Sequence, residues 1–407
     1  MTSDTTVWCA KFHFRDFDTE DGRSGRLGIS LHHHQVGVGM VLPVVFCNAP
    51  EISEVGQCHS ATNAYAHRYV YISTSRESIG FIMYKVPKMQ RRGNANFITP
   101  DGQEFAYVDA NTPSSNKVWK LSSENIYDEN NPLAYTLAPL YKSQRKPTNL
   151  LYAVYNDQPP NSHNGTRNGH TKGVVMFDDT TGIWLQHSVP RFMEELFTGK
   201  FTFPENAREN GQAILCVTFP TSQLNTIAKH LRMQYANIYE SGSPEALRRL
   251  HPQVDLLFKG SFIRGPKQKL SADIITSAGG KKFVSIAKRA TMQVDIYSEI
   301  ITNVTQDDIL VQSWRNGAGK KLDASCRTQY IVLDADAVNL SFGKNSLSWS
   351  SREDHSKWAV GIRKPWFCFG SLNRMESQFN RGGEVMCTQD AMLSSLFRRT
   401  GSTKETC

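Results

Sequence analysis

The chain has 407 residues, 39% of them hydrophobic and 21% charged, and its 46 Lys and Arg exceed its 38 Asp and Glu, giving a net charge of +8. This composition excludes a mostly disordered, collagen-like or disulfide-dense miniature protein, and because no run of 18 apolar residues occurs, we expect no membrane-spanning helix. The length suits two or three domains, or one large domain built from two similar halves. The positive charge favours a polyanionic partner, all the more in an acidic compartment, where the 12 His add to it.

Residues 1–76 form a predicted N-terminal extension whose first part is polar and aperiodic. Inside it, the apolar run at 36–47 has about the length of a signal-peptide core, and small residues follow where a signal peptidase reads. Two interpretations stay open: a signal segment near 36–49, with a later Met or a lost upstream exon as the true start, or a buried strand that Pro43 weakens. Three consecutive His at 32–34 lack Cys or acidic ligands at a suitable spacing, so we expect no metal there.

From Ile79 onward the pattern is that of a folded α/β protein. Apolar residues recur at a helical spacing over 221–239, and a second helix is predicted near 295–301. Residues 156–168, rich in Pro, Asn and Gly, predict a surface loop. Short runs rich in β-branched and aromatic residues, bounded by turn-forming residues, predict strands at 81–86, 150–155, 173–177, 183–189, 213–219, 282–287, 309–313 and 330–333.

Two tripeptides carry the candidate chemistry: His170-Thr171-Lys172 lies at the mouth of one predicted strand, and His355-Ser356-Lys357 precedes another apolar run. Residues i and i+2 of an extended segment point to the same face, so each tripeptide presents one imidazole beside one ammonium group. This suits phosphodiester cleavage, because one His can attack phosphorus, another can protonate the leaving oxygen, and two Lys can stabilise the developing charge without a metal. One imidazole must start neutral and the other protonated, which is easiest at mildly acidic to neutral pH. Chance alone gives about one His-x-Lys in such a chain, so the pair is suggestive only.

A series of segments surrounds these tripeptides, in this order along the chain: Tyr155–Pro160, Gly169–Val175, Gly182–Pro190, Gly211–Phe219, Glu353–Trp358, Pro365–Trp366, Gly370–Arg374 and Arg381–Gly383. Together they closely resemble the deoxyribonuclease II family. The resemblance extends from Ile79 to Cys407, and the combination of these motifs in this order is specific.

The resemblance implies an α/β fold of the phospholipase D-like type, a layered sandwich in which two similar halves form a pseudo-dimer around one cleft. We expect the first half at 77–235, with His170 and Lys172, and the second at 236–407, with His355 and Lys357. It further implies endonucleolytic, metal-independent cleavage of DNA at acid pH that leaves 3′-phosphate ends through a phosphohistidine intermediate. No cofactor is expected, and family members act in lysosomes or are secreted.

Residue by residue, the resemblance makes the two His and two Lys of the tripeptides the catalytic set. We favour His170 as the nucleophile and His355 as the general acid, although the sequence does not decide between them. His187, Ser371 and Asn373 are the predicted substrate-binding residues, with a core position for His187 as the open alternative. The superfamily's Asp five residues beyond each Lys is absent, and only the second half has a Gly-Ser-x-Asn element, at 370–373.

The Cys content suits the same family. Eight Cys occur, and six remain if the chain is cut after Ala49, an even number that fits an oxidising compartment. The resemblance implies the bridges Cys368–Cys387 and Cys326–Cys407. Three Asn-x-Ser/Thr triplets permit glycosylation in such a compartment, at Asn164, Asn303 and Asn339.

The family's N-terminal bridge is the exception. No Cys occurs in the expected partner region around Ala207, which leaves only Cys58 and Cys216. We expect Cys216 to be a free buried thiol rather than the partner of Cys58.

Two functions of different class remain open. The first is an active acid endodeoxyribonuclease, and the second is a secreted nucleic-acid-binding or host-interacting relative that has lost turnover. The presence of both His-x-Lys pairs favours the first. A lipid phosphodiesterase is disfavoured because the detailed segments resemble the nuclease branch. DNA is the expected partner, and the molecule is either a monomer with internal pseudo-symmetry or a homodimer.

Overall fold

The computed structural model describes residues 57–58, 80–89, 98–109, 112, 118–160, 168–317 and 319–407. The predicted signal segment, the His at 32–34 and nearly all of the predicted extension therefore lie outside the described residues. So does most of the predicted loop at 156–168. The described residues belong to one compact unit, Ser53–Cys407.

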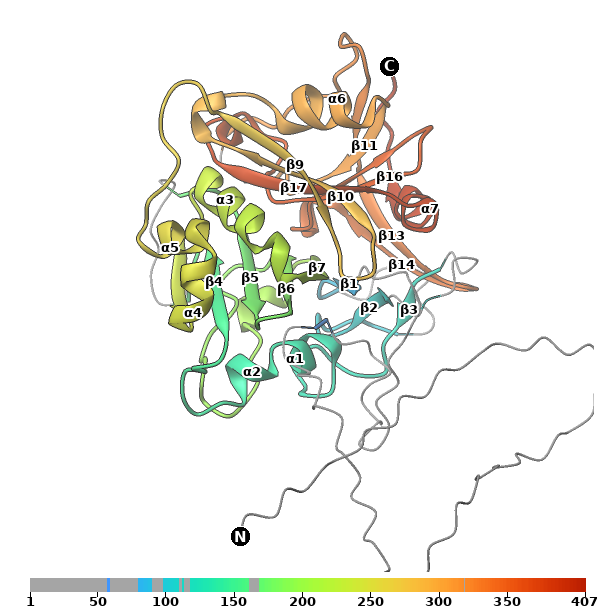
Figure 1. Ribbon diagram of the computed structural model, residues 1–407. Helices are drawn as coiled ribbons and strands as arrows, with labels where there is room; N and C mark the ends of the chain where they lie inside the picture. Colours follow the sequence, from blue (N-terminus) through green and yellow to red (C-terminus); the bar gives the residue numbers. More distant parts are fainter. Residues whose placement is uncertain are drawn as a thin grey trace, which may run out of the picture. The chain divides into compact units, whose positions relative to one another are not determined.

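The first large sheet has eight antiparallel strands in the order β3-β2-β1-β7-β6-β5-β4-β8 (Figure 1). Its strands are built from short apolar runs, as the sequence predicts, and their inner members are buried on both faces. Their bounds are β1 Phe81–Lys85, β2 Phe105–Asp109, β3 Lys120–Leu121, β4 Leu151–Asn156, β5 Lys172–Phe177, β6 Thr181–His187, β7 Gln212–Pro220 and β8 Ile238–Gly242.

The second large sheet has seven strands in the order β12-β11-β15-β16-β17-β10-β9. All neighbours are antiparallel except β11 and β12. Its bounds are β9 Leu270–Thr276, β10 Lys282–Lys288, β11 Ile309–Gln312, β12 Val332–Asp334, β15 Trp358–Gly361, β16 Trp366–Gly370 and β17 Gly383–Gln389. A small third sheet, β14-β13-β18, joins Ala337–Phe342 (β13) to Asn345–Ser350 (β14) and Gly401–Ser402 (β18).

Helices are few and short. The α-helices are α1 Pro132–Thr136, α2 Ala138–Tyr141, α3 Leu224–Gln234, α4 Glu245–Leu250, α5 Pro252–Phe258, α6 Thr302–Thr305 and α7 Ala391–Thr400, and a π-helical turn, Tyr297–Ile301, precedes α6. Single 3₁₀ turns occur at Glu205–Ala207, Thr221–Gln223, Ala290–Met292, Ser351–Glu353 and Glu376–Gln378. The predicted α/β class is confirmed. Within the residues described, none of these helices is long and apolar enough to cross a membrane.

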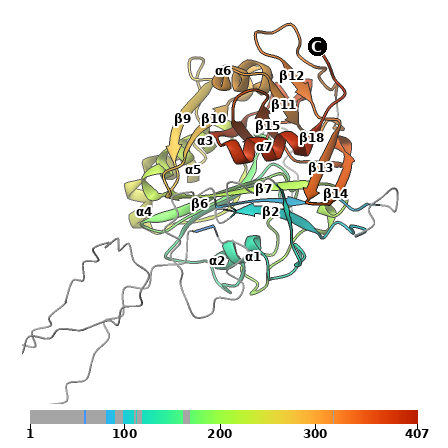
Figure 2. The ribbon, with the colours of Figure 1, turned by 90° about the vertical axis from the view of Figure 1, so that its right-hand side faces the viewer.

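Three hydrophobic cores separate these layers. The central core joins apolar side chains of both large sheets to those of α3 and α7, which lie between the sheets in Figure 2. A second core lies between the first sheet and α1 and α2, and a third lies between the second sheet and the π-helical turn. The two large sheets are therefore parts of one packed structure, which fixes their facing edges relative to each other.

The large sheets repeat one arrangement of neighbours. The run β2-β1-β7-β6-β5-β4 in the first sheet is matched by β9-β10-β17-β16-β15-β11 in the second. The strands β5, which begins at Lys172, and β15, which begins directly after Lys357, occupy the same place. This correspondence supports the predicted pair of similar halves, which stays a prediction. The boundary between 235 and 236 stays a prediction too, although β8, beyond it, hydrogen-bonds to β4.

Two local predictions were wrong. The helix expected over 221–239 ends at Gln234, because Tyr235 adopts a left-handed conformation (φ 62°) and turns the chain into β8. The loop expected from residue 156 begins one residue later, because Asn156 ends β4, and its first residue, Asp157, is buried rather than at the surface, with 4% of its area exposed. The Pro and Asn content that suggests a surface loop belongs to the residues beyond them.

The described residues form three disulfides, Cys58–Cys216, Cys326–Cys407 and Cys368–Cys387. The last two confirm the predicted pairs, and Cys368–Cys387 links neighbouring strands. The expectation that Cys216 is a free buried thiol was wrong. Cys58 reaches it because its backbone N–H donates to Thr218 Oγ1 (3.0 Å) on the same strand, which holds the segment against β7.

Candidate active site

The first tripeptide ends a loop and opens β5. Lys172 is the first residue of that strand, and the backbone N–H of His170 donates to the carbonyl of Gly382, on the loop that leads into β17 of the other large sheet (2.9 Å). Thr171, the middle residue of the tripeptide, is buried. The predicted position at a strand mouth is thus confirmed, and the tripeptide is fixed by the opposite sheet.

The second tripeptide is held in the same way. His355-Ser356-Lys357 leads into β15, and the backbone N–H of His355 donates to the carbonyl of Gly211 (2.8 Å), just before β7 of the first sheet. Lys357 is buried and donates through Nζ to the carbonyl of His355. Each tripeptide therefore hydrogen-bonds to a glycine on the other sheet.

Only glycine fits at these two contact positions. A Cβ at Gly211 would lie 2.3 Å from Oδ2 of Asp354, and a Cβ at Gly382 would lie 2.2 Å from the carbonyl oxygen of Gln234. Both distances are far inside van der Waals contact. The space beside Gly211 is thus filled by the Asp354 side chain and that beside Gly382 by the backbone of Gln234, so both contacts depend on the absence of a side chain at the glycine.

The His170 ring has a defined tautomer. Its Nδ1 lies 2.7 Å from the carbonyl oxygen of Ser371, which can only accept a hydrogen bond, so Nδ1 carries the proton. In the neutral ring, Nε2 is then the atom with the free lone pair, and it lies 4.0 Å from Asp157 Oδ2. Burial lowers the pKa of His170 well below its ordinary value, with Asp157 opposing and Lys172 reinforcing the shift. A neutral imidazole with Nε2 unprotonated is the form a nucleophile needs.

Asp157 is the anionic centre of the site. It contacts Lys172 Nζ, and its Oδ2 accepts from Arg381 (3.1 Å). Burial opposes ionisation, but Lys172, His170 and Arg381 together hold the pKa of Asp157 well below its usual range. The carboxylate is therefore charged at every physiological pH, and it offsets part of the positive charge that gathers here.

His355 lies among cations. Its ring packs against Trp314, with ring centroids 3.9 Å apart and planes 65° apart. Burial lowers its pKa far below the ordinary value, and Lys357, Lys172 and then Lys85 lower it further. Because Lys172 acts on His355 and Lys357 acts on His170, side chains of the two tripeptides lie within each other's electrostatic reach. The backbone joins the same groups, because the Gly370 N–H donates to the Lys357 carbonyl (2.9 Å) and the carbonyl of the next residue, Ser371, accepts from His170. The structure thus brings the two tripeptides together.

The predicted substrate-binding residues are near this group to differing degrees. His187 is 4% exposed; its Nδ1 accepts from the Val189 N–H (3.1 Å), so its proton sits on Nε2, which finds no hydrogen-bond partner among the described residues. Its pKa is lowered mainly by burial and then by Lys172. Ser371 holds His170 through its carbonyl. Asn373 is buried two residues further on, and its Oδ1 also lacks a partner in the described part of the chain.

A buried carboxyl lies beneath the middle residue of each tripeptide. Glu384 Oε1 accepts from Thr171 Oγ1 (3.1 Å) and from Tyr155 (3.2 Å), and burial raises the pKa of Glu384 to about 7. Asp354 accepts in turn from Ser356 and from Tyr84 (3.0 Å), and burial raises its pKa as well. Through these hydrogen bonds each carboxyl holds the middle residue of its tripeptide, between the His and the Lys.

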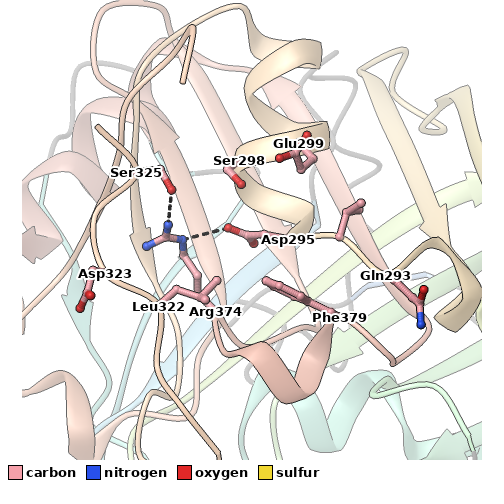
Figure 3. A pocket seen from close by; sticks show the side chains of 10 residues that line it. Gln293, Asp295, Ser298, Glu299, Leu322, Asp323, Ser325, Arg374 and Phe379 are labelled. Carbon is pink, nitrogen blue, oxygen red and sulfur yellow. Dashed lines mark hydrogen bonds and ion pairs between the residues drawn. The ribbon is translucent and has the colours of Figure 1, made fainter. Parts of the chain in front are cut away.

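A cavity of about 300 Å³ lies between the π-helical turn, the 322–325 loop and the segment 374–379, and the tripeptides do not line it (Figure 3). It contains none of the predicted site residues. Arg374 crosses its wall, where Nε donates to Asp295 Oδ2 (3.1 Å) and a terminal nitrogen donates to Ser325 Oγ (2.6 Å). Since Arg374 follows Asn373 directly, this ion pair fixes the end of the loop that carries Ser371. The remaining lining residues are Gln293, Val294, Ser298, Glu299, Leu322, Asp323 and Phe379.

Three contributors to the site were missed by the sequence reasoning. Asp157 and Arg381 lie inside the segments that resemble the family, but the sequence of a turn does not indicate whether a charged side chain in it is buried. Ser188 takes the place in the first sheet that Ser371 takes in the second, because each hydroxyl accepts from the N–H of the following strand, at Ala213 and Glu384 respectively. Among the described residues, no group of three His, Cys, Asp or Glu is arranged to hold a metal ion.

Comparison with known proteins gives a consistent result. The family model for Deoxyribonuclease II matches residues 80–407. Plancitoxin-1 of Acanthaster planci is 33% identical over 331 residues, which cover 80% of this chain and 89% of that protein. Deoxyribonuclease-2-alpha of Mus musculus is 34% identical over 312 residues (76% and 85%), and Deoxyribonuclease-2 of Caenorhabditis elegans is 29% identical over 340 residues (77% and 87%).

Proposed function

This chain belongs to the deoxyribonuclease II family of hydrolases, and on that premise we propose that it is an acid endodeoxyribonuclease that cleaves DNA without a metal ion and leaves 3′-phosphate ends. The observation that carries the proposal is the convergence of the two His-x-Lys tripeptides, each bonded to a glycine of the opposite sheet. DNA is the substrate of the family, and the three disulfides are consistent with a secreted or lysosomal location.

The reaction proceeds in two displacements. Nε2 of neutral His170 attacks phosphorus and forms a P–N bond, while the P–O5′ bond breaks and His355 gives its proton to the leaving 5′-oxygen. Neutral His355 then takes a proton from water, whose oxygen attacks phosphorus and breaks the P–N bond. The products are a 3′-phosphate end and a 5′-hydroxyl end. The Ser371 carbonyl, by fixing the Nδ1 proton of His170, keeps the attacking nitrogen unprotonated.

The cations supply the electrostatic part of the catalysis. Lys172 and Lys357 flank the phosphate and stabilise the charge that grows on its non-bridging oxygens. Burial lowers the pKa of Lys357 to about 7, with Lys172 next in effect, so this amine is fully charged only in acid. His187, Ser371 and Asn373 are further groups for holding the phosphate. The buried Nε2–H of His187, a donor without a hydrogen-bond partner among the described residues, supports this role, and Asn373 would contribute its amide N–H rather than Oδ1, which can only accept.

Acid pH follows from the same charges. His355 must carry a proton to act as the acid, and its pKa in the free protein lies far below the ordinary value because of burial and neighbouring Lys. Protonation, and with it activity, is therefore gained as pH falls. A bound phosphate raises the pKa of both imidazoles, which brings the working range up to the acidity of a lysosome.

The test is nicking of supercoiled plasmid in EDTA from about pH 4 to 8, with wild type, His170→Ala and His355→Ala. We expect acid-optimal nicking by the wild type and a loss of at least about 10⁴-fold in each variant. Activity that EDTA removes and a divalent ion restores contradicts the metal-independent mechanism. Intact plasmid throughout, from protein shown to be folded, supports instead the binding relative without turnover.

A further inference from the structure

Two lysines are buried at matching places in the two large sheets. Lys85 ends β1, next to β7, and Lys288 ends β10, next to β17. Both side chains are 0% exposed. Neither ammonium has an ion pair with a carboxylate of the described residues, so each is held by uncharged groups only.

Those groups are backbone carbonyls, and for each lysine at least one of them lies in the loop that leads into the neighbouring strand, β7 or β17. Lys85 Nζ donates to Arg208 O (2.8 Å) and to Gly102 O (3.3 Å). Lys288 Nζ donates to Phe379 O and to Arg381 O, both at 2.9 Å. Hydrogen bonds from a charged donor are stronger than neutral ones, and here they satisfy carbonyls that are turned inward.

Both loops run directly into the glycines that hold the tripeptides. Arg208 lies three residues before Gly211, whose carbonyl accepts from the His355 N–H. Arg381 immediately precedes Gly382, whose carbonyl accepts from the His170 N–H. Each lysine thus fixes, through one short stretch of backbone, the atom that orients one histidine.

A buried ammonium is costly unless its hydrogen bonds are needed, since an apolar side chain of the same length fills the space without desolvating a charge. Burial lowers the pKa of Lys85 to about 7 and that of Lys288 to about 8, which shows how far each charge is removed from solvent. In acid both amines are charged and donate fully, the condition in which the proposed reaction runs.

We propose that Lys85 and Lys288 are positioning residues, one for each half of the reaction: Lys85 holds the Gly211 loop that orients His355, and Lys288 holds the Gly382 loop that orients His170. Neither touches substrate. The inference rests on the proposed function, because it assigns the two histidines to separate chemical roles.

The experiment compares Lys85→Met and Lys288→Met with His355→Ala and His170→Ala on two substrates. One is plasmid DNA, and the other is the p-nitrophenyl ester of thymidine 3′-phosphate, whose leaving phenolate needs no proton. The ester is read as the first-turnover burst of p-nitrophenolate, before the phosphohistidine is hydrolysed, because His355 also serves as the base of that second displacement. In the burst, loss of the general acid is therefore largely hidden, whereas loss of the nucleophile is not. Lys344→Met, at an exposed turn of the third sheet, is the matched control. Thermal unfolding is measured for every variant, and Lys→Gln, which keeps an uncharged donor, replaces Met wherever the Met variant does not fold.

We expect a fall in kcat of about 10²-fold on DNA for each lysine variant with KM little changed, since a displacement of 1 Å has about that effect. Lys85→Met should recover on the ester as His355→Ala does, and Lys288→Met should remain impaired as His170→Ala does. Wild-type kcat in both variants, equal losses on both substrates, or the opposite pairing with the histidines overturns the proposal. A failure of the proposed function can be told apart from a failure of this proposal. In that case the wild type does not nick plasmid in acid, or His170→Ala and His355→Ala do not lose activity.

Discussion

The two tripeptides share a backbone setting but differ in what surrounds each imidazole. His170 has a carbonyl acceptor for its Nδ1 proton and a carboxylate 4.0 Å from Nε2. His355 has neither among its resolved contacts; an indole ring packs against it, and the charges acting on it are those of lysines. The same sequence motif therefore sits in two different electrostatic environments.

This difference indicates a division of labour that the motif alone does not contain. A base fixed in one tautomer beside a permanent anion suits bond formation to phosphorus, because Asp157 compensates the positive charge that develops on the ring. An imidazole among cations releases its proton readily, which suits the acid that protonates a leaving oxygen. The asymmetry thus supports His170 as nucleophile and His355 as general acid.

The comparison of halves extends to the disulfides, where we expect the largest effect on stability. Cys216 and Cys387 are each the fifth residue after the glycine that holds a tripeptide, but their bridges close loops of 158 and 19 residues. In the chain-entropy picture, removing the first by Cys58→Ser with Cys216→Ser costs about 5 kcal/mol, and removing the second costs about 3 kcal/mol. Denaturant unfolding of both double variants measures this, and a smaller cost for the longer loop contradicts the prediction.

The fold was predictable where the residues of a single strand are enough to identify it. Short β-branched and aromatic runs identified the strand of the first tripeptide and its neighbours to within about two residues, the usual uncertainty of element ends. Beside the second tripeptide only an apolar run was noted for β15, and β16 and β17 were not predicted. The β13–β14 hairpin was missed although its residues alternate between polar and apolar on both sides of Gly343, which is a strand pattern. β8 was missed because the helical spacing of α3 continues past Tyr235. The left-handed turn at Tyr235 leaves no mark on that spacing.

The candidate site was predictable as a set of residues but not as a geometry. The His and Lys positions follow from the motif, whereas the bonds from His355 to Gly211 and from His170 to Gly382 join residues more than 140 positions apart. Such pairings are decided by how the sheets pack. Asp157 shows the same limit, because its contacts with Lys172 and Arg381 are what distinguish a buried anion from a turn residue.

The next largest effect is expected in the pH dependence of the unfolding free energy, from the buried carboxyls that bond to the tripeptides. Glu384 has a pKa of about 7 in the folded protein because burial favours its neutral form, against an ordinary value of 4.5. Its contribution to stability is therefore intact below about pH 4.5 and is lost as pH rises through 7, a change of about 3 kcal/mol. Glu384→Gln should remove that loss, so that unfolding free energies of variant and wild type diverge, in favour of the variant, between pH 4.5 and 7.5.

The exposed Glu245→Gln, on α4, is the control and should follow the wild type at every pH. Asp354→Asn should behave like Glu384→Gln in sign, since burial raises the pKa of Asp354 too. A Glu384→Gln protein whose stability falls with pH as steeply as the wild type shows that this carboxyl is ionised in the folded state, and the parallel between the two anchors then fails.

The smallest effect is expected from substitution of Asp157, the carboxylate beside His170. Asp157 raises the pKa of His170, although burial has the larger, opposite effect. Asp157→Asn should therefore move to lower pH the limb of the kcat/KM profile that His170 sets. It should also lower kcat/KM about tenfold, because the charge compensation is lost. The limb that His355 sets should stay in place, because Asp157 is not among the groups that shift His355.

Trp314→Leu is the matched variant on the other side. Its indole lies against the His355 ring and, by cation–π attraction of about 1 kcal/mol, favours the protonated form. Its removal should move the other limb to lower pH by less than about one unit and leave the first in place. Two substitutions that each displace a different limb establish that the imidazoles titrate in separate environments. If both displace the same limb, the histidines act as one coupled pair, and the division of labour between the halves has to be abandoned.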